Sequence, residues 1–238
     1  MLSAISEMDP VLIAAAVIPA VILMVQVYRA DRLEKEPAGI LISLLVFGVF
    51  ATALAIVTET IGENILNLLF DEINLGYLIL WNFLVVALSE EGFKFLLLRA
   101  RTWRSPNFNC QFDGVVYAVF VSLGFALWEN IGYVAMYGFG TALARAVTAV
   151  PGHACFGVFM GVWYGAARRY ANYGDPVGAR VCRRRALWAP VFIHGMYDFL
   201  ASLEFAYSGL IFIAFIVVVF LVAMRRVKIV SRNDRYIA

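Results

Sequence analysis

The sequence predicts an all-α polytopic membrane protein, a bundle of about seven transmembrane helices with its N-terminus outside and its C-terminus in the cytoplasm. Three observations predict this class: the composition, the lengths of the apolar runs and the distribution of the basic residues. Of the 238 residues, 63% are apolar and only 15% are charged, and the mean hydropathy is +0.82. A water-soluble domain is much less apolar, so the chain is expected to lie in the lipid bilayer as a multi-pass protein of the cell membrane.

Seven apolar runs have the length of about 17–25 residues that crosses roughly 30 Å of hydrocarbon. In chain order they cover residues 10–28, 38–58, 75–98, 113–136, 145–167, 187–203 and 208–224. The first run is interpreted as a retained span, because Glu7 and Asp9 precede it where a signal peptide would carry basic residues. Residues 59–72 are expected to form a short amphipathic helix on the outer surface, with a re-entrant segment as the alternative.

The basic residues fall in alternate loops. Residues 28–38, 99–112, 168–186 and the tail after residue 224 hold 17 of the 19 Lys and Arg residues, whereas the N-terminus and the other loops hold none. Cytoplasmic loops carry the excess of Lys and Arg, so the first group is expected in the cytoplasm. No loop is long enough to fold separately, and residues 1–238 are therefore expected to form a single domain.

The third run carries three charges at membrane depth, in Glu90-Glu91-Gly92-Phe93-Lys94. An ionisable side chain there costs about 2.5–3.5 kcal/mol on insertion scales, which indicates a functional site that faces the protein interior. On a helix, Lys94 is four residues from Glu90 and three from Glu91, so it lies between them on one face. One lysine cannot neutralise both acids, and one carboxyl is left for acid–base chemistry. The alternative is an inert Glu90–Lys94 ion pair.

Three further runs carry polar side chains, which are Glu129 and Asn130, His153, and His194 with Asp198. At a rise of about 1.5 Å per residue, all but Asn130 lie within roughly 4–8 Å of the midpoint of their span, as Glu90 does. They can therefore meet in one cavity. Asp198 is four residues from His194, so it can accept from one imidazole nitrogen and leave the other directed at the site. The alternative is a polar ridge that joins two helices.

Three polar residues have less specific interpretations. Asn130 points about 100° away from Glu129, so it either binds a backbone carbonyl, as a lone membrane Asn usually does, or offers its amide to a developing oxyanion. Asp113 and Arg145 lie at the mouths of the fourth and fifth runs, and both are expected to be interface anchors.

In combination, these motifs resemble the PrsW-type intramembrane proteases, which are related to CAAX prenyl endopeptidases and bacteriocin-processing membrane proteases. Glu90-Glu91-x-x-Lys94 resembles the family's double-glutamate motif, Phe125-x-x-x-Glu129-Asn130 its second motif and His194-x-x-x-Asp198 its last. The resemblance implies a catalytic core at about residues 31–203. It also implies a bacterial glutamic-type peptidase, with a metallo-type enzyme as the alternative, that cleaves membrane-anchored protein substrates such as an anti-sigma factor.

Peptide hydrolysis needs an activated water, a stabilised oxyanion and a proton for the leaving amine. We expect Glu90 or Glu91 to activate the water, helped by His153 or Glu129. We expect His194, oriented by Asp198, to support the oxyanion and the leaving group together with Asn130. No cofactor is expected. The alternative is zinc bound by the two histidines and a glutamate, which Lys94 would oppose as a nearby cation.

Two other classes of function are consistent with polar residues at membrane depth. A proton-coupled transporter also places carboxylates and histidines at the midplane, but no inverted repeat or pair of broken helices is evident. A non-catalytic membrane scaffold is the other alternative. The sequence has no phosphate-binding glycine loop and a net charge of only +2, so neither a nucleotide nor a nucleic acid is expected as a partner.

Overall fold

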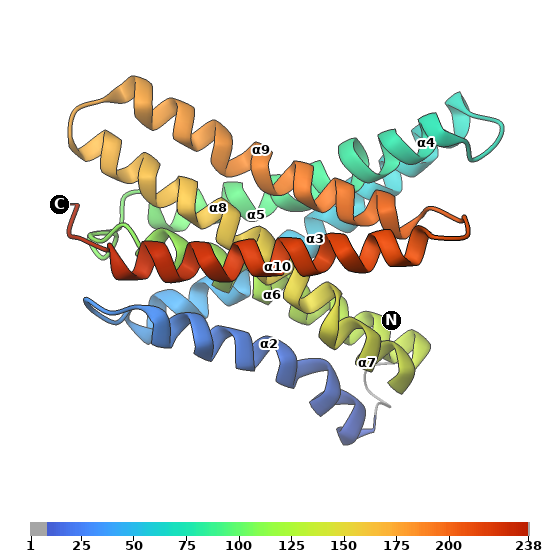
Figure 1. The fold of residues 1–238 in the computed structure, drawn as a ribbon, viewed down its shortest axis with the longest axis horizontal. Coiled ribbons are helices and arrows are strands. Elements are labelled where there is room, and N and C mark those ends of the chain that lie inside the picture. The colour runs from blue at the N-terminus through green and yellow to red at the C-terminus, as the bar shows by residue number, and fades with distance from the viewer. Residues whose placement is uncertain (1–8, 238) are drawn as a thin grey trace.

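The computed structural model describes residues 9–237, and in that range the chain forms seven helical segments and no strand (Figure 1). Two of the segments are interrupted and comprise more than one element. The elements are α2 (Pro10–Ala30), α3 (Ala38–Leu69), α4 (Leu75–Ile79), the π-helix η1 (Leu80–Ala87), α5 (Leu88–Thr102), α6 (Asp113–Tyr137), α7 (Phe139–Val147), α8 (Ala149–Asn172), α9 (Pro176–Ala201) and α10 (Ser208–Arg232).

The seven helical segments confirm the predicted all-α class. By length and composition five of them could cross a membrane: α2, α3, α6, α7 with α8, and α10. The prediction of a separate surface helix at residues 59–72 is wrong, because α3 continues for 32 residues as far as Leu69. The predicted exterior N-terminus, with Glu7, lies outside the described residues.

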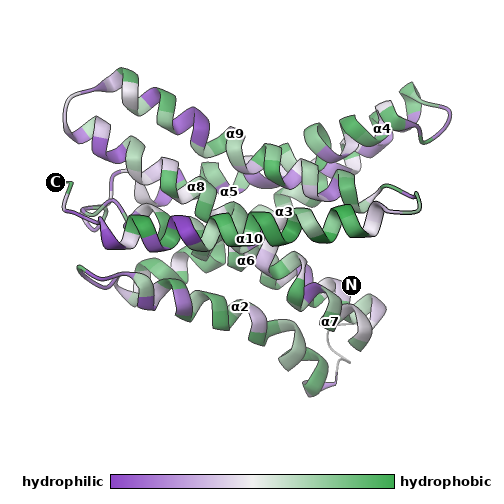
Figure 2. Cartoon of the chain, in the orientation of Figure 1, coloured by the Kyte–Doolittle hydropathy of each residue, from purple (hydrophilic) through white to green (hydrophobic). Residues whose placement is uncertain are grey.

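The basic loops gather at one end of the bundle. Figure 1 shows residues 31–37, the α5–α6 loop, the α8–α9 loop and the C-terminal tail together at the left, opposite the α3–α4 and α9–α10 loops. Figure 2 shows the same left end enriched in hydrophilic residues, with hydrophobic residues along α2 and α10. This arrangement is the one that the alternating charges predict, and the side of the membrane on which each end lies remains a prediction.

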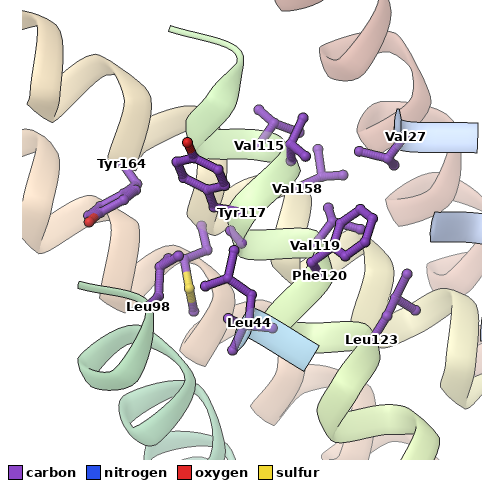
Figure 3. Close-up of a cluster of buried hydrophobic side chains, with 14 of the residues drawn as sticks. Val27, Leu44, Leu98, Val115, Tyr117, Val119, Phe120, Leu123, Val158 and Tyr164 are labelled. Atoms are coloured by element: carbon purple, nitrogen blue, oxygen red, sulfur yellow. The ribbon is translucent and has the colours of Figure 1, made fainter. Parts of the chain in front are cut away.

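Helix α6 forms the centre of the bundle. It packs against α2, α3 and α8, and every residue from Asp113 to Ala126 is buried. Figure 3 shows part of the core around α6, where Val115 and Val119 lie in one cluster with Leu44 of α3 and Val158 of α8. By contrast, only 6% of the most apolar window of α10 is buried within the protein. Its apolar side chains therefore face the lipid, as expected for a bundle in a bilayer.

Small residues permit close packing of α6 against its neighbours. A Cβ atom on Gly161 of α8 would lie 2.4 Å from the Cα atom of Val115, and one on Gly124 would lie 2.3 Å from the carbonyl oxygen of Leu45 in α3. Any larger residue at these positions would push the helices apart. Glycines at such crossings are common in membrane bundles, where close backbone approach stabilises helix association.

Candidate active site

The double glutamate lies in the first turn of α5, directly after a π-helical stretch. Residues Leu80–Ala87 form η1, and Glu90, Glu91 and Lys94 follow on α5. A π-helix widens the turn and changes which side chains face inward, and such turns often occur at functional sites. Here the three charged side chains face the interior: Glu90 is 5% exposed, and Glu91 and Lys94 are fully buried.

Lys94 joins both glutamates, as the spacing predicts. Its Nζ atom lies 3.0 Å from Glu90 Oε2, 2.8 Å from Glu91 Oε1 and 3.2 Å from His153 Nδ1 on α8. An ammonium group can only donate hydrogen bonds, so Nδ1 of His153 must accept. The hydrogen of a neutral His153 is then on Nε2, which donates to Glu129 Oε2 at 2.9 Å.

His194 lies between two carboxylates. Its Nδ1 is 3.0 Å from Glu91 Oε1, and its Nε2 is 3.1 Å from Asp198 Oδ2, which is the predicted pair along α9. Ionised carboxylates only accept hydrogen bonds, so this geometry requires a hydrogen on both ring nitrogens. The arrangement therefore favours the imidazolium form of His194, which can donate a proton.

A cavity of about 380 Å³ joins these groups. Its lining includes Glu90, Glu129, His153, His194 and Asp198, which come from four different helices. Five of the seven residues predicted for the site thus share one cavity. Glu91 and Asn130 are absent from the lining, although both contact residues that do line it.

Two predictions about neighbouring residues need correction. Arg145 is not an interface anchor, because its Nη2 atom lies 2.8 Å from Glu129 Oε2 and the residue lines the cavity. Asn130 is fully buried, its Nδ2 donates to the carbonyl of Ala16 in α2 at 2.8 Å, and its Oδ1 accepts from Arg145 Nε at 3.0 Å. This is the helix-joining role, and it directs the amide of Asn130 away from the cavity.

Sequence reasoning missed Glu59. This residue was assigned to a surface helix, but α3 carries it into the bundle, where it lines the cavity with Glu90 and Glu129. A signal was present in the sequence, since Glu59 and Glu63 follow an apolar stretch without a proline that would end the helix. Its Oε1 atom is buried and has no hydrogen-bond partner within the described residues.

The side chains of this site are of types that can bind a metal, but their arrangement does not suit one. One ligand atom each from Glu90, His153 and His194 lies within 4.8 Å of the others, and two histidines with a carboxylate are a known zinc set. However, all four imidazole nitrogens already face Lys94, Glu129, Glu91 or Asp198 at 2.9–3.2 Å. The ammonium of Lys94 contacts two carboxylates and a histidine, so it takes the place that a metal cation would need.

Comparison with known proteins identifies relatives along nearly the whole chain. Residues 36–224 match the model of the family described as PrsW family intramembrane metalloprotease. The chain is 31% identical over 222 residues to Protease PrsW of Oceanobacillus iheyensis. The aligned region covers 93% of this chain and 97% of the relative. It is 33% identical over 226 residues to Protease PrsW of Geobacillus kaustophilus, with 91% of each chain covered.

A third relative, Protease PrsW of Bacillus subtilis, is 30% identical over 198 residues, which is 80% of this chain and 83% of the relative. No solved structure matches the chain. The matches extend from the arm before α3 into α10, so they include every helix that lines the cavity. The chain therefore belongs to the PrsW family of intramembrane proteases, multi-pass proteins of the bacterial cell membrane.

Proposed function

We propose that the protein hydrolyses peptide bonds of membrane-anchored proteins with a water molecule activated by Glu90. One observation carries this assignment: Glu90 lines the cavity, whereas Glu91 is fully buried and does not. A general base must reach the water that it activates. Glu91 instead uses Oε1 to hold both Lys94 and His194, at 2.8 and 3.0 Å. It therefore acts as a positioning residue.

The surrounding groups supply the other requirements of peptide hydrolysis. Glu90 takes one proton from water as the water oxygen bonds to the carbonyl carbon. His194 then gives a proton to the amide nitrogen, and the C–N bond breaks to leave a carboxylic acid and an amine. Glu90 Oε2 lies 3.9 Å from His194 Nδ1, so the proton taken from water can return to His194. Both groups thereby recover their starting state.

Arg145 is the group that we assign to the developing oxyanion, in place of Asn130. Its guanidinium lines the cavity and is held from two sides, by Glu129 at 2.8 Å and by Asn130 at 3.0 Å. A fixed cation in a water-poor site stabilises negative charge strongly, because it needs no reorganisation during the reaction. Asn130 then acts through Arg145 as a positioning residue.

The proposed mechanism uses no metal. Lys94 already supplies positive charge between the two glutamates and His153. The test is exhaustive chelation of purified protein in detergent, followed by metal analysis and a cleavage assay on a single-span substrate. We expect the cleavage rate to be unchanged. Stoichiometric zinc that is lost in the His194→Gln variant, together with activity that returns only with zinc, would contradict the proposal.

The substrate class follows from the position of the cavity among membrane helices. A protein with a single span and a soluble domain, such as an anti-sigma factor, has the expected chemistry. The assay uses such a substrate in liposomes with wild-type protein and with Glu90→Gln, and the product is sequenced for a new N-terminus within or beside the span. Cleavage by wild type alone supports the proposal. Equal cleavage by both proteins would show that Glu90 does not activate the water.

A further inference from the structure

A second group of buried acids lies at the opposite end of the bundle, among the basic loops. It consists of Asp31, which ends α2, Glu36 in the arm before α3, and Asp113 at the start of α6, and we call it the acidic cluster. The three side chains are 2%, 3% and 0% exposed. One carboxylate oxygen from each lies within 4.8 Å of the other two.

Within residues 9–237 the acidic cluster is only partly balanced, by the nearby charge of Lys35 acting on Asp31. None of its carboxylates forms a salt bridge there, although arginines are frequent in the adjacent loops. The nearest lysine, Lys35, directs its Nζ to the backbone carbonyls of Tyr28, Arg29 and Asp31 at the end of α2. Lys35 therefore caps a helix and does not pair with these acids.

Several oxygens of the cluster lack any partner in the described chain. Both carboxylate oxygens of Asp31 are buried without a hydrogen bond, as are Oε1 of Glu36 and Oδ1 of Asp113. The opposite oxygens are fixed: Tyr117 donates to Glu36 Oε2 at 2.6 Å, and the amides of Asn109 and Cys110 donate to Asp113 Oδ2 at 3.0 and 2.7 Å. Glu36 and Asp113 are thus oriented with one free acceptor each, and both oxygens of Asp31 are free.

Three buried carboxylates whose oxygens lie within 4.8 Å of one another repel one another and lose their hydration. Because burial removes these carboxylates from water, the fold alone disfavours their charged forms. A bound cation would reverse this cost. Carboxylate oxygens in a hard-oxygen site suit Mg²⁺, Mn²⁺ or Ca²⁺, and two oxygens on opposite sides of a calcium ion are about 4.6–5.2 Å apart.

We infer that Asp31, Glu36 and Asp113 form a binding site for a divalent cation that prefers oxygen ligands. The site joins the C-terminal end of α2, the arm before α3 and the start of α6. The C-terminal tail closes over the same region, where Asp234 accepts from the Phe112 amide at 2.9 Å. Cation binding would hold these segments together. It is independent of the proteolytic mechanism, because the cavity that holds Glu90 has none of these residues in its lining.

The test measures cation binding to the full-length protein in detergent after treatment with EDTA. MgCl₂, CaCl₂ or MnCl₂ is added, and the melting temperature and the amount of bound Mn²⁺ are recorded. We expect one Mn²⁺ per chain and a melting temperature that rises by roughly 5–10 °C for the best of the three cations at about 100 times its dissociation constant. No rise with any of the three cations would overturn the inference.

Matched variants identify the ligands. Asp31→Asn is expected to weaken binding at least tenfold, whereas Glu72→Gln removes an equal charge from an exposed residue of the α3–α4 loop and should bind as wild type does. In EDTA, Asp31→Asn should be at least as stable as wild type, because it removes repulsion between carboxylates. If Asp31→Asn does not fold, Glu36→Gln takes its place in the comparison.

A further control separates this site from the proteolytic cavity, whose donor types could also take a metal. The Glu90→Gln and His194→Ala variants should retain the bound Mn²⁺ and the rise in melting temperature. Equal binding by wild type and Asp31→Asn, or loss of binding in Glu90→Gln alone, would place the cation elsewhere and refute the acidic cluster as its site.

Discussion

The unequal positions of Glu90 and Glu91 allow their roles to be separated by paired substitutions. Glu90→Gln removes a carboxylate that lines the cavity and cannot be replaced as a base by an amide. General acid–base catalysis contributes about 10²–10⁴-fold, so we expect the cleavage rate to fall by about 10³-fold, or roughly 4 kcal/mol of activation free energy. Glu90→Ala should cost about as much, because both variants lose the base.

Glu91 should respond differently to the two substitutions. One oxygen, Oε1, accepts from Lys94 at 2.8 Å and from His194 at 3.0 Å, and the amide oxygen of glutamine can accept both bonds. We expect Glu91→Gln to lower the rate only about 10- to 100-fold, in the range for residues that orient a reacting group. Glu91→Ala removes the acceptor altogether, leaves Lys94 and His194 each short of a partner, and should lower the rate well beyond the glutamine variant.

The assay measures initial cleavage rates of a reconstituted single-span substrate, normalised to the amount of inserted enzyme. Melting temperatures accompany each rate, because removing one partner of a buried ion pair can cost about 3–5 kcal/mol of stability. The Glu72→Gln variant, at an exposed residue of the α3–α4 loop, is the control for loss of a charge away from the cavity. A Glu91→Gln enzyme that is as slow as Glu90→Gln, while remaining equally stable, would refute the assignment of the base to Glu90.

Three further outcomes are expected. Asp198→Asn should lower the cleavage rate about 10- to 100-fold, because His194 loses the charge that orients it, and an unchanged rate would contradict this role. A reporter that is active only outside the cytoplasm should be active after Gly140 and silent after Gly174, and the reverse would refute the predicted sidedness. Gly161→Val should abolish accumulation of the protein in the membrane, since the new Cβ would lie 2.4 Å from a neighbouring Cα. The control variant Gly140→Val, whose Cβ would have nothing within 4 Å, should accumulate normally. Equal accumulation of the two variants would refute the close-packing argument.

The fold class and most of the cavity were predictable because charges at membrane depth are costly and therefore informative. Glu90, Glu129, His153, His194 and Asp198 stand out for this reason, and the structure brings them together. Their positions near the middle of apolar runs, together with helical spacing, were enough to identify them.

The remaining features depend on tertiary structure. Whether Asn130 faces α2 or the cavity is decided by the rotation of α6 in the bundle, which a single sequence does not specify. Arg145 reaches Glu129 because α7 and α8 are separate helices that meet at Thr148, so an apparent mouth residue turns inward. Asp113 was expected to be an anchor, but segments far apart in the chain enclose it with Asp31 and Glu36.

The length of α3 has a consequence for which bonds the enzyme can reach. Its 32 residues span about 48 Å, against roughly 30 Å of hydrocarbon, and tilts beyond about 40° are rare. One end of α3 therefore has to stand among the lipid headgroups, or the local bilayer has to become thicker. Glu59 is 10 residues from the Leu69 end of α3, so the cavity that it lines is about 15 Å from that end. We therefore expect water to have a short route to Glu90, and we expect cleavage of juxtamembrane bonds just outside the hydrocarbon as well as of bonds within a substrate's span.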